Sequence, residues 1–147
     1  MSTTSKASKY AEAIGVDDWM GRDVRVLLLK DTHTLTPDRA TTFLSELNLG
    51  TNEVTASGYA RVECEQIAAA WDDTDPDDAG WTYSVDTVVT PAIAADGGYD
   101  GWVFYEHITD DTDSPWLRID SAPGAIDFDG GTVTLTVTGL WRTGQQD

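Results

Sequence analysis

The sequence contains one cysteine, two histidines and only nine basic residues, and each shortage excludes a class of protein. A single thiol, Cys64, excludes a disulfide within the chain and a zinc site built on cysteines. Because Cys64 lies in an alternating segment, we interpret it as a buried or half-buried side chain. No stretch approaches the roughly 20 apolar residues of a membrane-spanning helix. Residues 1–6 also lack the apolar run of a signal peptide, so we expect no membrane insertion and no standard secretory export.

Positive charge is also scarce, since three lysines and six arginines face 26 acidic residues, for a net charge of −17. Of these acids, 20 are aspartate and six are glutamate. Such a surface repels phosphate and anionic lipid, so we expect neither nucleic acid nor a membrane as a partner. An aspartate-rich, lysine-poor composition is typical of proteins from high-salt cells, where salt screens the self-repulsion. An acidic protein from a GC-rich genome is the alternative.

Aromatic residues make up 10% of the 147 residues and hydrophobic residues 40%, which is enough for one packed domain. Residues 24–29 are apolar at nearly every position and predict a strand buried on much of both faces. The cleanest alternation is at 132–137, where we expect Val133, Leu135 and Val137 to point inward. Further strand-like segments lie at 53–56, 59–66, 81–89, 102–108, 116–119, 126–128 and 140–142.

About eight short strands with polar turns predict an all-β protein, a single antiparallel β-sandwich, with a small barrel as the related alternative. Short helical turns are expected near residues 5–14 and 38–48, the second with Pro37 near its start and Gly50 at its end. We divide the chain into a flexible or partner-bound N-terminal arm with a short helix at 1–20 and a β-sandwich domain at 21–147.

Groups suited to catalysis are few. We expect His33 to be solvated in a polar loop and His107 to lie on a strand face with Val103 and Tyr105. The chain has no nucleophile-elbow, zinc-protease or phosphate-loop motif. We therefore predict that the protein is not an enzyme, with no catalytic residue and no cofactor. A hydrolase built on the acidic loops, the least favoured alternative, would need two carboxylates with one raised pKa.

Two acidic loops could bind calcium or magnesium weakly. Tested from Asp73, an EF-hand loop would need glycine where Asp78 stands and glutamate where Ser84 stands, so that motif fails. A looser site stays open, although a solvated acidic loop is the favoured interpretation. The weak metal candidates are Asp73, Asp75, Asp77, Asp110, Asp111 and Asp113. The six tryptophans could form a sugar-binding platform, but large aromatics in a small sandwich usually fill the core or an interface.

One stretch resembles a known family. Residues 43–47 (Phe-Leu-Ser-Glu-Leu) and 52–61 (Asn-Glu-Val-Thr-Ala-Ser-Gly-Tyr-Ala-Arg), which follow the strand 24–29, are similar to a pattern in small β-sandwich structural proteins of tailed viruses. The likeness continues through later strands and covers roughly residues 20–142. These later strands lie in 85–93, 102–105, 116–120, 130–137 and 139–141.

The resemblance implies a non-enzymatic virion protein, assembled in the host cytoplasm as a homo-oligomer with other virion proteins as partners. It would belong to the capsid surface, as a decoration or turret protein, or to the tail. A receptor- or carbohydrate-binding module of a tail tip or fibre, in contact with the host surface, is the alternative. The excess of acid points to a virus of halophilic archaea, with an actinobacterial phage as the alternative.

Four residues of this motif are expected to be structural, namely Glu53, Gly58, Tyr59 and Arg61. Arg61 is expected to pair with a carboxylate and fix strand register. Gly58 is expected to supply a backbone conformation or a close approach that a Cβ would block. Small sandwiches also expose edge strands, which assembly into symmetric oligomers would cover.

Overall fold

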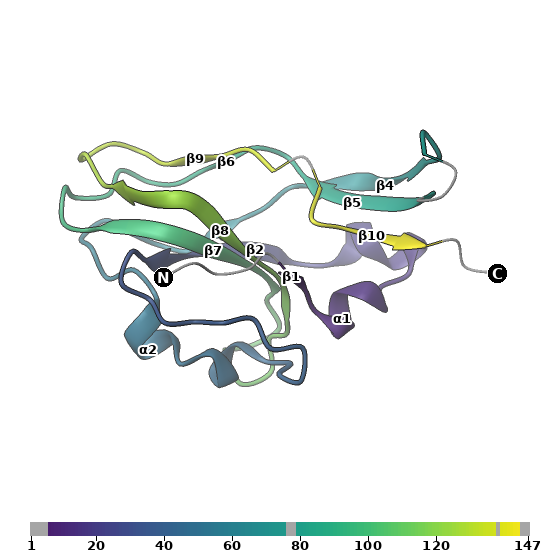
Figure 1. Cartoon of the computed structure of the whole chain (residues 1–147), viewed down its shortest axis with the longest axis horizontal. Helices are drawn as coiled ribbons and strands as arrows, with labels where there is room; N and C mark the ends of the chain where they lie inside the picture. The colour runs from purple at the N-terminus through teal and green to yellow at the C-terminus, as the bar shows by residue number, and fades with distance from the viewer. Residues whose placement is uncertain (1–5, 76–78, 138, 145–147) are drawn as a thin grey trace.

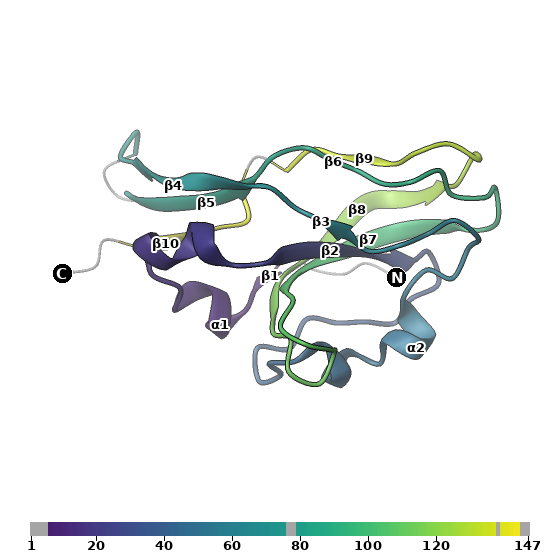
Figure 2. The same ribbon diagram turned by 180° about the vertical axis from the view of Figure 1, so that it is seen from behind.

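The computed structural model describes residues 6–75, 79–137 and 139–144. It has 40% strand and 14% helix in three antiparallel sheets, which confirms the predicted all-β, sandwich-like fold (Figures 1 and 2). The described strands are β1 (Lys6–Ala7), β2 (Val24–Lys30), β3 (Val62–Glu63), β4 (Gln66–Asp72), β5 (Gly80–Val85), β6 (Val88–Val89), β7 (Gly98–Glu106), β8 (Trp116–Asp127), β9 (Thr134–Leu135) and β10 (Trp141–Gly144). The sheets have the orders β1-β8-β7-β2-β3, β10-β5-β4 and β6-β9.

The main core lies between the five-stranded sheet and the two smaller sheets. One buried cluster contains Val26 of β2 and Phe104 of β7 together with Tyr83 of β5 and Leu135 of β9. Val133 and Val137 pack against the same cluster while the threonines at 134 and 136 are exposed, so the predicted inward face of 132–137 is confirmed.

A second buried cluster covers the opposite face of the five-stranded sheet. There Leu27 and Val103 pack with Leu44, which belongs to the loop and helices that lie beneath the sheet in Figure 1. Because both faces of β2 are covered, its run of apolar residues is buried on both sides, as predicted. Residues of β2 therefore contribute to both buried clusters.

Residues 6–20 belong to the domain and do not form the separate arm expected from the sequence. Strand β1 pairs with β8, and helices α1 (Lys9–Glu12) and η1 (Val16–Gly21) follow it. Ala11 and Trp19 are fully buried, and the Trp19 ring meets the Trp141 ring edge-on at 5.3 Å between centroids. Burial of these apolar side chains stabilises the docked position. Residues 1–5 lie outside the described part.

The helices differ in detail from the sequence prediction. Helix α1 lies within the expected 5–14 segment, and the Ser8 Oγ caps it by accepting a bond from Ala11 N at 2.9 Å. The second helical segment begins later than Pro37, as η2 (Leu44–Leu47) and α2 (Leu49–Asn52). Asn48, with φ of 53°, separates these two helices, so Gly50 lies inside α2 and does not end it.

Strand β4 was not predicted, because three consecutive alanines give no polar and apolar alternation. Its pairing with β5 is irregular between Ile67 and Ala70, and it forms a border of the three-stranded sheet. Conversely, the strand expected at 53–56 is reduced to an isolated bridge between Leu29 and Glu53. Among the described residues, every helix falls short of the length and apolarity required to cross a membrane.

Candidate functional site

Four polar side chains of the motif and the loop after β7 meet in one network, which we call the Arg61 clamp: Glu53, Tyr59, Arg61 and Asp111. Arg61 Nε and Nη2 donate to the two Glu53 carboxylate oxygens at 2.8 Å each. Its Nη1 and Nη2 donate to the Asp111 oxygens at 2.6 and 3.0 Å. Tyr59 Oη donates to Glu53 Oε2 at 2.5 Å and accepts from Leu28 N at 3.1 Å. The clamp therefore ties the 53–61 segment to β2 and to the loop that joins β7 and β8.

Local backbone geometry positions these side chains. Glu53 directly follows α2, where its N–H donates to Leu49 O at 2.9 Å and its bridge to Leu29 fixes it beside β2. The chain then turns at Gly58, whose φ of 87° is left-handed, and a Cβ at this position would overlap the Ala92 carbonyl oxygen. This turn directs Tyr59 and Arg61 back toward Glu53.

An aromatic ring supports the Arg61 guanidinium from another side. The guanidinium carbon lies 5.4 Å from the centroid of Tyr105, a β7 residue that is 1% exposed. The Arg61 and Glu53 side chains are 26% and 15% exposed, so their ion pair is largely shielded from water. Partial burial makes the loss of either partner costly, because the other would keep an uncompensated charge.

The electrostatics of the clamp suit structural support better than proton transfer. Hydrogen bonds to Glu53 raise the pKa of Arg61 above its already high value, although burial opposes this. Burial raises the pKa of Tyr59 well above its ordinary 10.0, and the Glu53 carboxylate adds to the increase. A permanently charged guanidinium and a permanently neutral phenol exchange no proton near neutral pH. Acid–base catalysis needs a group that titrates near the working pH.

Stability should fall in alkali, because several buried groups keep their protons in the folded state longer than in the unfolded state. Burial raises the pKa of Cys64 from 9.0 to about 12 and also raises those of Tyr59 and Tyr105. The unfolded chain loses these protons first, so the free energy of unfolding decreases above about pH 9 for Cys64 and above about pH 10 for the tyrosines, by up to roughly 1.4 kcal/mol per pH unit for each group. Urea denaturation between pH 8 and 11 should show this decline, with a shallower slope for Tyr59→Phe. Equal slopes in the two proteins would contradict the assignment.

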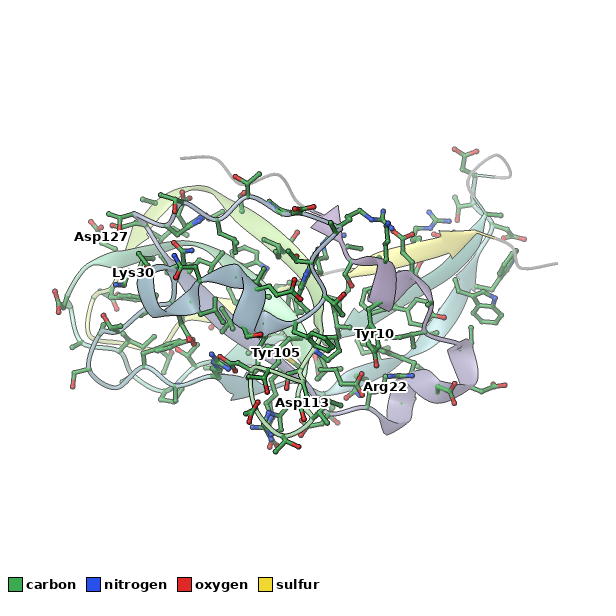
Figure 3. All side chains as sticks on the ribbon, turned by 90° about the horizontal axis from the view of Figure 1, so that it is seen from below. Tyr10, Arg22, Lys30, Tyr105, Asp113 and Asp127 are labelled. Atoms are coloured by element: carbon green, nitrogen blue, oxygen red, sulfur yellow. The ribbon has the colours of Figure 1, made fainter. Side chains whose placement is uncertain are left out.

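A second polar network, formed by Tyr10, Arg22 and Glu106, was not predicted from the sequence. Arg22 Nη1 donates to Glu106 Oε1 at 2.8 Å and to Tyr10 Oη at 2.7 Å, and Tyr10 Oη donates to Glu106 at 2.6 Å. Figure 3 shows Tyr10 and Arg22 side by side. Glu106 is only 7% exposed at the end of β7, so this network joins α1 and η1 to the main sheet. The three residues are far apart in the chain, so no local pattern predicts the network. The only signal in the sequence is the Glu106 carboxylate at the end of an apolar strand, which needs a partner if it is buried.

The histidines have structural surroundings. His33 is 2% exposed and so is not solvated as expected; its Nδ1 accepts from Leu35 N at 3.1 Å within a tight turn. Burial lowers the pKa of His33, while the Asp100 carboxylate acts in the opposite direction. His107 is half-buried just after β7, where its N–H donates to Asp23 O at 2.8 Å. Both residues thus take part in local backbone structure.

The acidic loop 109–115 binds its own backbone. Asp113 Oδ1 accepts from the N–H groups of Thr109 and Asp110 at 3.0 Å each, and Asp110 Oδ1 accepts from Thr112 N at 2.8 Å. Hydrogen bonds from backbone N–H groups lower the pKa of Asp113, while Asp111 turns to Arg61. The three carboxylates therefore have separate partners within the protein.

The other candidate metal ligands are Asp73 and Asp75, which are exposed, and Asp77, which lies outside the described residues. Across residues 6–75, 79–137 and 139–144, no three acidic, histidine or cysteine side chains converge as metal ligands would. The geometry of the described carboxylates therefore gives no support to the calcium or magnesium site considered from the sequence.

Each of the six arginines has a carboxylate partner within the molecule. The pairs range from the clamp to the exposed contact of Arg142 with Asp72 at 3.7 Å. The remaining pairs are Arg22–Glu106, Arg25–Asp23, Arg25–Glu63, Arg39–Glu12 and Arg118–Asp120. Arginine is thus used for internal cohesion in this structure.

The tryptophans are mostly core residues. Trp19, Trp116 and Trp141 are buried, whereas Trp71 is 39% exposed and meets the half-buried Trp81 edge-on at 5.6 Å between ring centroids. Trp102 is also half-buried. A groove of about 340 Å³ opens beside Trp81, between β5 and the segment 12–16. Of the six tryptophans, all of which lie in the described residues, Trp71 alone is exposed, so they form no row of rings at the surface.

Comparison of the chain with family models, curated proteins and solved structures found no match. The function is therefore argued from the fold and from the geometry of the clamp.

Proposed function

We propose that this protein is a non-enzymatic structural component of a tailed-virus particle, present as an oligomer on the capsid surface or in the tail. The observation that carries the proposal is the hydrogen-bond network that the motif residues form. Glu53, Tyr59 and Arg61 hydrogen-bond to one another, to β2 and to Asp111, so they hold this part of the fold together. A scaffold protein requires this kind of rigidity, and an enzyme would require a titrating group.

The architecture supports the same proposal. The five-stranded sheet is covered on both faces, and two ionic networks tie the neighbouring segments to it near the end of β7, so the domain is built as a rigid block. Sheet borders such as β4 stay available for neighbouring subunits. The arginines are paired within the molecule, so the net charge of −17 leaves an acidic exterior whose self-repulsion is screened in concentrated salt.

A salt requirement is expected if the particle belongs to a halophilic host. Screening lengths shrink from about 10 Å at 0.1 M salt to about 3 Å at 1 M, which removes repulsion between surface carboxylates. The melting temperature should therefore rise by several degrees between dilute buffer and 2 M KCl. Differential scanning calorimetry across this range measures the effect, and a melting temperature that does not change would contradict the halophilic origin.

Immunogold electron microscopy tests the proposed location. Antibodies raised against the recombinant chain should label particles released by cells that encode it. Gold on heads would assign a decoration or turret role, and gold on tails would assign a tail or fibre role. Particles without label, in preparations where a known capsid antibody binds, would contradict the proposal.

A receptor- or carbohydrate-binding role at a tail tip is the second candidate, and the contact of exposed Trp71 with half-buried Trp81, which lines the groove, favours it. Aromatic faces stack on sugar rings, so a bound glycan should shift tryptophan fluorescence. Titration with host surface glycans, using Trp71→Ala as the control, distinguishes this role. Fluorescence that does not change with any glycan would remove it.

A further inference from the structure

Strand β4 gives the three-stranded sheet an uncharged border. No residue from Gln66 to Trp71 carries a charge, although the chain as a whole has a net charge of −17. Ile67 is 47% exposed and Trp71 39% exposed, and Ala68 and Ala70 are exposed between them. In the part of the chain that the structure describes, β5 is the only strand that pairs with β4. Figures 1 and 2 show β4 at the outer side of this sheet.

Helix η1 covers one end of this border and leaves the other end open. Trp19 Nε1 donates to Ile67 O at 2.8 Å, and Gln66 Nε2 donates to Trp19 O at 3.2 Å. The open part therefore consists of residues 68–72. Sheet borders are normally protected from pairing by charge, proline or a β-bulge. Neither charge nor proline occurs between Gln66 and Trp71, and the irregular pairing with β5 is confined to the stretch between Ile67 and Ala70.

We propose that residues 68–72 of β4 pair antiparallel with the same residues of a second copy, about a two-fold axis at Ala70. The two three-stranded sheets then form one continuous six-stranded sheet. A second copy is the occupant that the charges favour, because two acidic molecules repel each other least where their surfaces are uncharged. The inference deepens the proposed function, because it names the strand through which two copies of the chain pair. It rests on the proposed function only for the place of the dimer in a virus particle.

The side chains are self-complementary in this register. Trp71 lies opposite Ala69 of the second copy, so a large side chain meets a small one on the same face. Asp72 lies opposite Ala68 of the second copy, and its own charge is balanced by Arg142 at 3.7 Å. From residue 66 to residue 74 the pairing places no carboxylate opposite another, whereas pairing centred on Ala69 would set Asp73 against Glu65.

Light scattering coupled to size-exclusion chromatography tests the pairing on the full chain, in 0.1 M and 2 M KCl. The protein should have twice the 16.0 kDa mass of one chain, with tighter association in the higher salt. Ala70→Asp should weaken dimerisation at least tenfold and make Trp71 more accessible to acrylamide. The matched control is Ala125→Asp, which adds the same charge at an exposed alanine of β8 and should leave the dimer intact.

Cysteine cross-linking provides a second measurement that does not depend on a disruptive charge. In a Cys64→Ser background, Ala70→Cys places two thiols at the axis, within the Cα separation that a disulfide allows. Ala68→Cys is the control, since its two copies would be offset by about 13 Å along the strands. Oxidation should join the first variant and not the second.

Three results would overturn the inference: a single-chain mass in both salts, a dimer of Ala70→Asp as tight as that of the unchanged protein, or equal cross-linking at positions 68 and 70. The two proposals fail separately. A confirmed β4 dimer with no protein in particles would contradict the virion role alone. Particle-bound protein without the cross-link at position 70 would contradict this inference alone.

Discussion

Replacing Arg61 with methionine should lower the free energy of unfolding by about 3 kcal/mol, the cost expected when one partner of a shielded ion pair is removed. The substitution leaves Glu53, whose side chain is 15% exposed, without its two bonds from the guanidinium. It also frees Asp111 and with it the loop between β7 and β8. For a chain of this size the loss corresponds to a decrease in melting temperature of about 10 °C. Urea denaturation followed by tryptophan fluorescence measures it.

Arg25→Met is the matched control for this prediction. Arg25 also contacts two carboxylates, but its partners Asp23 and Glu63 have side chains that are 44% and 75% exposed. Exposed pairs contribute little, so the control should lose no more than about 1 kcal/mol. Equal losses in the two variants would show that the clamp is an ordinary surface contact and would remove the main support for a structural role of the motif.

Gly58→Ala should be as damaging, with an expected loss of about 3 kcal/mol. The left-handed φ of 87° alone costs an alanine about 1–2 kcal/mol. The new Cβ would in addition overlap the Ala92 carbonyl oxygen, so either the turn or the strand-like segment near Ile93 has to move. Movement of the turn would also displace Tyr59 and Arg61 from Glu53.

Gly97→Ala separates the conformational cost of an alanine at positive φ from the cost of the steric overlap at Gly58. Gly97 has a similar φ of 73°, but a Cβ there meets nothing within 4 Å. It should therefore show the conformational cost alone, about 1 kcal/mol. If both variants were equally stable in chemical denaturation, the close approach at Gly58 would have no energetic importance.

Sequence patterns predicted the elements whose neighbours are local or whose burial is uniform. The unbroken apolar run of β2 and the alternation around Leu135 follow directly from which faces are covered. The Arg61 clamp was partly predictable, because Glu53, Tyr59 and Arg61 are close in sequence and an arginine among many acids is expected to be paired. Its second carboxylate, Asp111, comes from a loop 50 residues away, and no local pattern specifies that contact.

Other features depend on tertiary contacts that a single sequence does not reveal. Strand β4 has no alternation, because its alanines pack loosely at a border of the sheet. Residues 2–9 are rich in serine, threonine and lysine, which favours a flexible terminus, yet Ala11 and Trp19 just after them are buried in the core. His33 lies among polar neighbours in the sequence but is buried by distant elements. In each case the apolar or polar character of nearby residues was a poor guide to burial.

Mass spectrometry of purified virus particles, separated into heads and tails, tests the central claim most directly. The account predicts that the chain is a stoichiometric component of one fraction. Hundreds of copies per particle in heads would identify a capsid decoration or turret protein, and a few to a few dozen copies in tails would identify a tail or fibre protein. Absence from both fractions, in particles whose other structural proteins are detected, would contradict the proposed function.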